Sequence, residues 1–205
     1  LSSLSASSSS SSLSLSPLSL SVSILTFCSS TLQLEELRFV NIILSSQPLF
    51  ETCCAGCTHT ADTTLIMNDC IFRDITQMST DSSAILNTET HTSITMRGCV
   101  FENVVSQKEE GEIMILHTST LVMSNIHRSR TLTQSSPGEI FLNAECTDVC
   151  NCIWHHSAIR LRAVSAALED SSFQHIDDGA LSIEEDSLLT LKQVSFVMES
   201  DDIAT

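Results

Sequence analysis

Two groups of side chains in this 205-residue chain have the types and spacing of a reactive or metal-binding site. In the first, C-C-A-G-C-T-H, closely spaced thiols and an imidazole could meet one zinc ion. Structural zinc sites take four ligands, usually from two separated pairs, and this segment has no separated second pair. A surface loop with a local disulfide or free thiols is therefore the favoured interpretation. The candidate zinc ligands are Cys53, Cys54, Cys57 and His59.

The second group is the acidic turn Asp177-Asp178-Gly179. It resembles the paired aspartates of polygalacturonase-like enzymes, in which an acid and a base flank the scissile bond. The N-T-D, G-H-G and R-I-K segments that accompany the pair in those enzymes have no match here. A solvated turn is therefore favoured over a catalytic role for Asp177 and Asp178. With these two, Glu184, Glu185 and Asp186 could hold calcium through hard oxygen ligands, although acidic loops are usually only solvated.

The charge balance limits the classes of partner. Nine basic residues against 25 acidic ones give a net charge of −16, so binding to nucleic acid, which needs arrays of Lys and Arg, is excluded. Polyanionic sugars are disfavoured for the same reason unless calcium bridges them. The G-x-S-x-G nucleophile motif and the glycine-rich phosphate loop are both missing.

A repeated spacing of apolar residues organises most of the chain. In 93–104, Ile94 and Met96 lie two residues apart, as do Cys99 and Phe101, and 64–75 repeats the pattern. A period of two indicates strands, and the polar break between the two pairs indicates a corner. The column that contains Phe101 also holds Phe39, Phe72, Arg128, Trp154, Phe173 and Phe196. Because all but one of these residues are aromatic, we call it the aromatic column.

Other features of the repeat predict further corners and a third strand. A residue that tolerates left-handed backbone follows the aromatic at Asn41, Asp74 and Asn103, and more loosely at His156 and His175. Small residues precede another alternating run between copies, as in Gly179-Ala180-Leu181. Each turn should therefore hold three short parallel strands. The expected interior ladders are Leu65, Ile94 and Leu121; Met67, Met96 and Met123; and Cys70, Cys99 and Ile126.

These patterns predict an all-β, single-stranded right-handed parallel β-helix of about six to seven coils, truncated at both ends. An antiparallel sandwich also has evenly spaced strands, but it gives no reason for the same residue classes to return in the same order. A helical repeat would need ten or more residues at a period of 3.6, and no copy supplies them.

The F-x-N corner at 101–103 and the small-small-apolar strands resemble the repeats of right-handed, pectate-lyase-like β-helix proteins, in particular the polymorphic outer-membrane protein type and large surface proteins of protists. The resemblance covers about 31–203. The G-G-A-[ILV] motif of that type is only partly kept, at 83–85 and 179–181. The resemblance implies surface exposure and adhesion.

The chain divides into a Ser/Leu-rich low-complexity segment, 1–27, and a β-helix domain, 28–205, that is partial and uncapped at its C-terminal end. We expect no packed structure for 1–12, and a weak strand, a signal remnant or filler for 13–27. Cys70 and Cys99 should fill the core, and Cys150 and Cys152 should share a face. At Arg128 and Arg130, which replace the expected Phe and Asn, either the register slips or the turn opens outward.

Two functions remain open. The favoured one is a non-catalytic surface, adhesion or structural module that binds proteins or glycans through its faces and loops, without a cofactor. We expect it to be extracellular or at the cell surface, within a longer chain that has other domains. The alternative is a carbohydrate-active β-helix, lyase-like or hydrolase-like, in which Asp177 and Asp178 lie in a groove.

Overall fold

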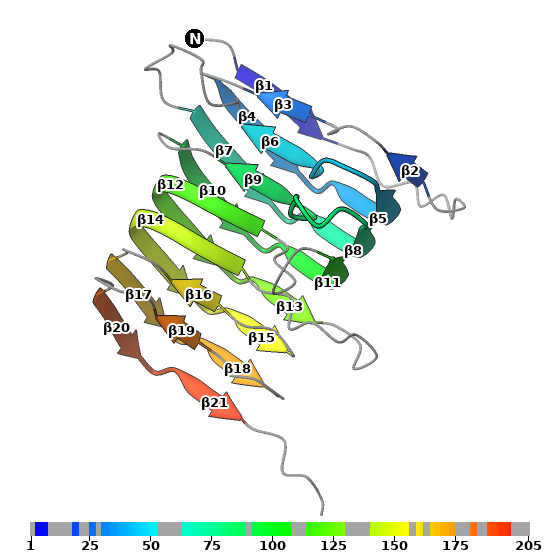
Figure 1. Ribbon diagram of the computed structural model, residues 1–205. Helices are drawn as coiled ribbons and strands as arrows, with labels where there is room; N and C mark the ends of the chain where they lie inside the picture. The colour runs from blue at the N-terminus through cyan, green and yellow to red at the C-terminus, as the bar shows by residue number, and fades with distance from the viewer. Residues whose placement is uncertain are drawn as a thin grey trace, which may run out of the picture.

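The computed structural model describes residues 3–7, 18–20, 25–27, 30–52, 63–88, 92–107, 114–129, 140–155, 159–161, 165–174, 181–183 and 188–197. Every described element is a β-strand, and all the strand pairs are parallel, each strand lying beside its counterpart from the next repeat of the sequence (Figure 1). The chain is therefore all-β with parallel strands in stacked sheets, which is compatible with a parallel β-helix and consistent with a solenoid.

An eight-stranded sheet carries the aromatic column. Its second, third and fourth strands are each bent by a residue in the left-handed conformation, at Asn41, Asp74 and Asn103, as the sequence predicts. In order across the sheet the strands are β2 (Leu18–Leu20), β5 (Arg38–Leu44), β8 (Ile71–Gln77), β11 (Val100–Ser106), β13 (His127–Ser129), β15 (Ile153–His155), β18 (Ser172–Gln174) and β21 (Ser195–Val197).

The other thirteen strands form two rows that share the long strands β12 (Met114–Ser124) and β14 (Ile140–Cys150). One row adds β1 (Ser3–Ser7), β4 (Thr31–Glu35), β7 (Thr63–Asn68), β10 (Thr92–Arg97), β17 (Ser165–Glu169) and β20 (Leu188–Lys192). The second row adds β3 (Leu25–Phe27), β6 (Phe50–Thr52), β9 (Leu86–Thr88), β16 (Ile159–Leu161) and β19 (Leu181–Ile183).

The register confirms the predicted ladders. Met96 pairs with Met67 on one side and with Met123 on the other, and Ile94 pairs with Leu65 and Leu121 in the same way. All six side chains are buried. The aromatic column is continuous from Phe39 to Phe196, with rings stacked at 5.0–5.2 Å and interplanar angles of 6–10° for the Phe39–Phe72, Phe72–Phe101 and Phe173–Phe196 pairs.

A second column of left-handed residues forms the corner between the β7 row and the eight-stranded sheet. Gly98 has φ +62, and the non-glycine residues of this column have φ between 49 and 54. Asn and Asp, which make up four of the six non-glycine members, tolerate this conformation because their short side chains bond locally to the backbone. The non-glycine members are Glu36, Asp69, Asn125, Asn151, Asp170 and Gln193.

Three expectations from the sequence are wrong. The serine tract 1–12 contributes β1, which pairs in register with β4, because a parallel ladder needs only backbone groups from its edge strand. Cys150 is half-buried whereas Cys152 is buried, since the left-handed Asn151 between them reorients the chain. At Arg128 the register neither slips nor opens, because Arg128 pairs with Phe101 and Trp154 and is fully buried.

Candidate functional site

The two site candidates from the sequence lie outside the described residues. Cys53, Cys54, Cys57 and His59 fall in 53–62, and Asp177 and Asp178 fall in 175–180. Both sites therefore stay predictions. Within the ranges that the structure describes, no three His, Cys, Asp or Glu side chains gather to hold a metal ion, and no helix there is long and apolar enough to cross a membrane.

The strongest exposed constellation lies on β8 and β11, and we call it the polar ladder: Arg73, Asp74, Glu102 and Asn103. Arg73 and Glu102 each follow an inward-facing Phe of the aromatic column, so strand alternation turns them outward. The next residue in each strand is left-handed, at Asp74 and Asn103. The repeat thus presents two polar side chains in succession on each strand.

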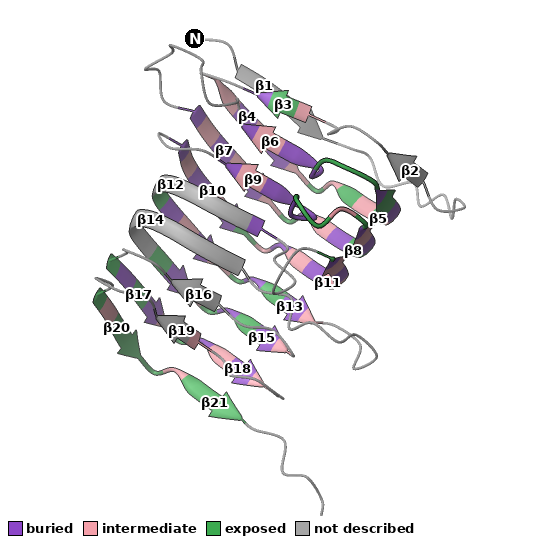
Figure 2. Cartoon of the chain, viewed as in Figure 1, coloured by how far each residue is buried: buried purple, intermediate pink, exposed green. Residues whose placement is uncertain are grey.

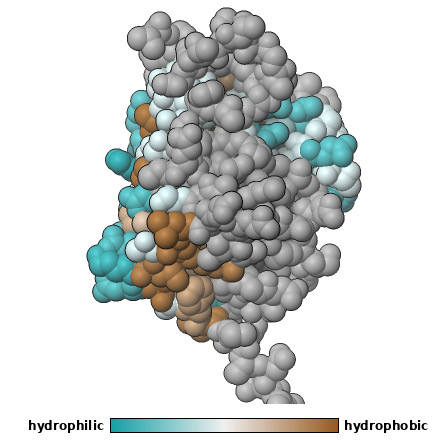
Figure 3. Space-filling view, turned by 60° about the vertical axis from the view of Figure 1, so that its left-hand side comes forward, coloured by the Kyte–Doolittle hydropathy of each residue, from teal (hydrophilic) through white to brown (hydrophobic). Residues whose placement is uncertain are grey.

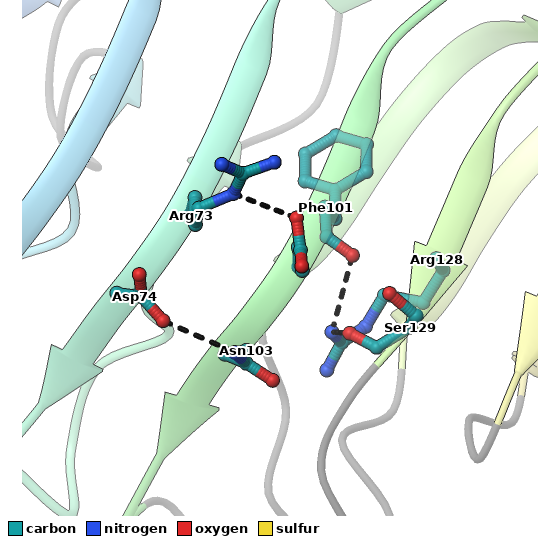
Figure 4. A network of polar contacts seen from close by, with 7 residues as sticks. Arg73, Asp74, Phe101, Asn103, Arg128 and Ser129 are labelled. Carbon is teal, nitrogen blue, oxygen red and sulfur yellow. Dashed lines mark hydrogen bonds and ion pairs between the residues drawn. The ribbon is translucent and has the colours of Figure 1, made fainter.

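Two contacts join the strands of the polar ladder (Figure 4). Arg73 Nε donates to Glu102 Oε2 at 2.6 Å, and Asn103 Nδ2 donates to Asp74 Oδ1 at 3.1 Å. The side chains of the ion pair are 48% and 36% exposed, so a ligand can reach both. Because a guanidinium carries five N–H donors in a planar fork, a bond through Nε leaves the terminal amines able to bind a second group.

This arrangement is suited to binding. A guanidinium fork, a carboxylate and an amide held side by side on a rigid sheet can recognise hydroxyl, carboxylate and peptide groups. Each carboxylate of the polar ladder already accepts a bond from the neighbouring strand. That pairing fixes the direction of the side chains and lowers the entropy lost when a ligand binds.

Behind the polar ladder lies a buried guanidinium. Arg128 occupies the aromatic column next to Phe101 and is fully buried. Its Nη1 donates to the carbonyl oxygens of Ser129 at 2.6 Å and Phe101 at 3.4 Å, and its Nη2 donates to that of Val104 at 2.9 Å. These bonds tie β13 to β11 (Figure 4). Arg128 therefore supports the strand that carries Glu102 and Asn103.

The cysteines form a separate, interior column at the corner that follows the left-handed residues. Cys70, Cys99 and Cys152 are buried free thiols. Each thiol bonds the carbonyl oxygen two residues before it, at 3.4, 3.5 and 3.2 Å respectively. Burial raises the pKa of Cys152 to about 12 and, in the partly buried Cys150, also raises the pKa. Such protonated thiols serve packing, as the sequence predicts for Cys70 and Cys99.

Cys70 and Cys99 occupy adjacent positions of this column, because the residues that flank them pair in register. The neighbouring Cys70 thiol, together with burial, raises the pKa of Cys99, and the neighbouring Cys99 thiol lowers the pKa of Cys70 because it can donate to a Cys70 thiolate. The two groups therefore lose their protons in succession, Cys70 first.

Sequence reasoning missed the polar ladder, although its signal was present. Arg73 and Glu102 have opposite charges at the position directly after the aromatic in consecutive copies. Opposite charges at matching positions of neighbouring strands attract. Comparison of the copies for charge as well as for apolar residues would have found the pair.

Comparison with known proteins adds no family to these observations. No protein-family model matches the chain, and searches of the curated proteins and of the solved structures find no similar protein.

Proposed function

We propose that this chain is a right-handed parallel β-helix of about six to seven coils that acts as a non-catalytic binding module at a cell surface. The polar ladder is its contact site for a protein or a glycan. The observation that carries the proposal is the pair of exposed contacts on β8 and β11, Arg73 to Glu102 and Asn103 to Asp74. On each strand, the residues before and after the polar pair are buried and hold this surface in place. They are Phe72 and Ile75 on β8, and Phe101 and Val104 on β11.

The chain offers a matched control for this site. Lys192 on β20 and Glu169 on β17 also form an exposed ion pair between neighbouring strands, and this contact with Glu169 raises the pKa of Lys192. It lies in a different sheet from the polar ladder. Both pairs join a cation to a glutamate across neighbouring strands, with side-chain exposures of 48% and 36% in the ladder and 66% and 38% in the control. The control lacks a guanidinium fork and the neighbouring amide contact, which are the features assigned to binding.

The test compares three proteins on an array of neutral and acidic glycans: the wild type, the double variant Arg73→Ala/Glu102→Ala and the control Lys192→Ala/Glu169→Ala. We expect the wild type and the control to bind the same glycans, and the ladder variant to bind them at least about tenfold more weakly, the loss of one charge-assisted hydrogen bond. Equal binding by all three proteins would contradict the assignment of the polar ladder.

The carbohydrate-active alternative rests on the turn Asp177-Asp178-Gly179. It is tested by incubation of the protein with pectin and alginate, with and without calcium. Release of shortened or unsaturated sugar that disappears in Asp178→Ala would show a catalytic β-helix and overturn the non-catalytic proposal. We expect no release from either polymer.

A further inference from the structure

Cys70 and Cys99 are neighbours in the corner column of the stack. The residues on either side of them pair in register, Asn68 with Arg97 and Ile71 with Val100. The backbone N–H of Val100 also donates to the carbonyl of Cys70 at 2.9 Å. Neighbouring strands lie about 4.7–4.9 Å apart, which is within the range of about 4.4–6.8 Å that Cα atoms joined by a disulfide show.

The two side chains also face one another. Both side chains are fully buried, and because the strands before and after them pair in register, they point into the same interior. The two thiols therefore occupy adjacent positions of the column, and a small approach of the two corners suffices to join them.

No other cysteine in the described part of the column has a cysteine next to it. Leu37 precedes Cys70 and Ile126 follows Cys99, as shown by the backbone bonds from Ile71 to Leu37 and from His127 to Cys99. Cys152 is the next thiol in the column and is separated from Cys99 by Ile126. The stack therefore selects one partner for each member of the pair.

We propose that Cys70 and Cys99 form a disulfide that joins consecutive repeats when the chain folds in the presence of a low-molecular-weight disulfide. The bond would close a loop over residues 71–98, which contains β8, β9 and β10. A crosslink of this kind stabilises a fold mainly by restricting the unfolded chain. The structure, with both thiols free, corresponds to the reduced form.

The exchange takes place in two balanced steps. The thiolate of Cys70 attacks one sulfur of the small disulfide, forms a mixed disulfide and releases one small thiolate. The thiolate of Cys99 then attacks Sγ of Cys70, forms the protein disulfide and releases the second small thiolate. Two electrons pass to the small disulfide, and the two thiol protons pass to the released thiolates. Because both sulfurs are buried in the stack, the first step takes place before the two repeats close, and the second takes place as they close and bring Cys99 beside Cys70.

The experiment refolds the full chain in oxidised and reduced glutathione, alkylates the remaining thiols in denaturant, and digests the protein with trypsin and an aspartate-directed protease. Cys70 is then the one cysteine of peptide 69–73, and Cys99 the one cysteine of peptide 98–108. We expect these peptides joined, two hydrogen atoms lighter than their sum, and separated by reduction. We also expect the oxidised protein to unfold at a higher urea concentration than the reduced protein.

Two variants make the result specific. Cys152→Ser should keep the linked peptides, and Cys70→Ser should lose both the link and the difference in urea midpoint between the two redox forms. If Cys70→Ser fails to fold, the wild-type peptide map still shows whether Cys70 and Cys99 are linked. Alkylated Cys70 and Cys99 after refolding, glutathione left on either one, or linkage of either to another cysteine would each overturn the proposal.

Discussion

Phe101 and Phe196 occupy equivalent positions in the aromatic column, yet Phe101 is completely buried and Phe196 is 48% exposed. The same contrast holds between Met96, with no exposed surface, and Leu191, at 46%. The interior strands β10 and β11 have a neighbour on both sides, whereas β20 and β21 have one described neighbour each. Burial in this architecture is therefore set by the number of adjacent repeats more than by residue type.

The smaller number of neighbouring strands at β20 and β21 leaves apolar side chains exposed there. Hydrophobic surface gathers toward the C-terminal strands, over exposed Leu188, Leu191, Phe196 and Val197 (Figure 3). In the interior, side chains of the same kind lie between neighbours and contribute to the core (Figure 2). Because burial of an apolar side chain contributes about 25 cal/mol per Å², equivalent substitutions in the two regions should have very different effects.

The largest expected effect tests this contrast directly. Phe101→Ala removes a ring stacked on Phe72 at 5.0 Å and should lower the free energy of unfolding by about 3–5 kcal/mol. Phe196→Ala removes a half-exposed ring and should cost about 1 kcal/mol. Urea unfolding followed by circular dichroism measures both values. Equal losses would show that the end strands are as tightly packed as the interior.

The next effect concerns an interior position that departs from the aromatic pattern. Arg128→Ala deletes the donors to three backbone carbonyls in a site without solvent contact, and it should cost about 3 kcal/mol. Arg128→Met keeps the volume and should cost less, because an apolar side chain can replace a buried charge at little loss. If Arg128→Ala left the free energy of unfolding unchanged in the same assay, the guanidinium would not support the stack.

A smaller effect is expected at the corner column. At Gly98, φ is +62, and an added Cβ would lie 2.1 Å from Oδ1 of Asp69 in the adjacent repeat. Gly98→Ala should therefore cost about 1–2 kcal/mol. Gln193 has φ 53 at the equivalent corner of the last described repeat and already carries a Cβ, so Gln193→Ala should change stability by less than about 0.5 kcal/mol. Thermal unfolding of the two variants compares the corners, and a larger loss at Gln193 would contradict this account.

The last effect is absent at neutral pH and appears only in alkaline solution. The pKa of Cys152 is raised from 9.0 to about 12, so the unfolded chain loses this proton at a lower pH than the folded chain. The stabilisation is complete below pH 9 and is lost as the pH rises toward 12, by roughly 1 kcal/mol per pH unit. Cys152→Val should flatten that part of the stability profile. A wild type and a variant with parallel profiles between pH 9 and 11 would contradict the shift.

Much of the fold could be predicted because the same classes of residue return at the same positions in each repeat. The alternation around Ile94 and Met96 and the polar break at Arg97-Gly98 predicted the strands, the corner and the ladder partners that the register confirms. Period-two alternation with a turn residue involves only residues close together in the sequence, so it predicts strands without knowledge of the tertiary structure.

The errors occurred where a neighbouring repeat decides the outcome. Arg128 was expected to disturb the stack because an isolated guanidinium in a core is unfavourable, yet carbonyls of its own strand and of β11 accept hydrogen bonds from its Nη1 and Nη2. The serine tract was expected to remain unpacked, yet β4 offers an edge with which any backbone can pair. For the polar ladder, a single copy of the repeat shows only that its residues are polar. The pairing of these residues across strands depends on the next copy.

The sequence by itself determined which residues alternate, where each strand bends and which residue classes return in order, because backbone preference and polarity act within a few residues. Only the tertiary structure decided that Arg73 meets Glu102, that backbone carbonyls hold Arg128 inside the column and that Phe101 is buried while Phe196 is not. Those facts depend on contacts between residues 19 to 33 positions apart, and such contacts exist only once one repeat has stacked on the next.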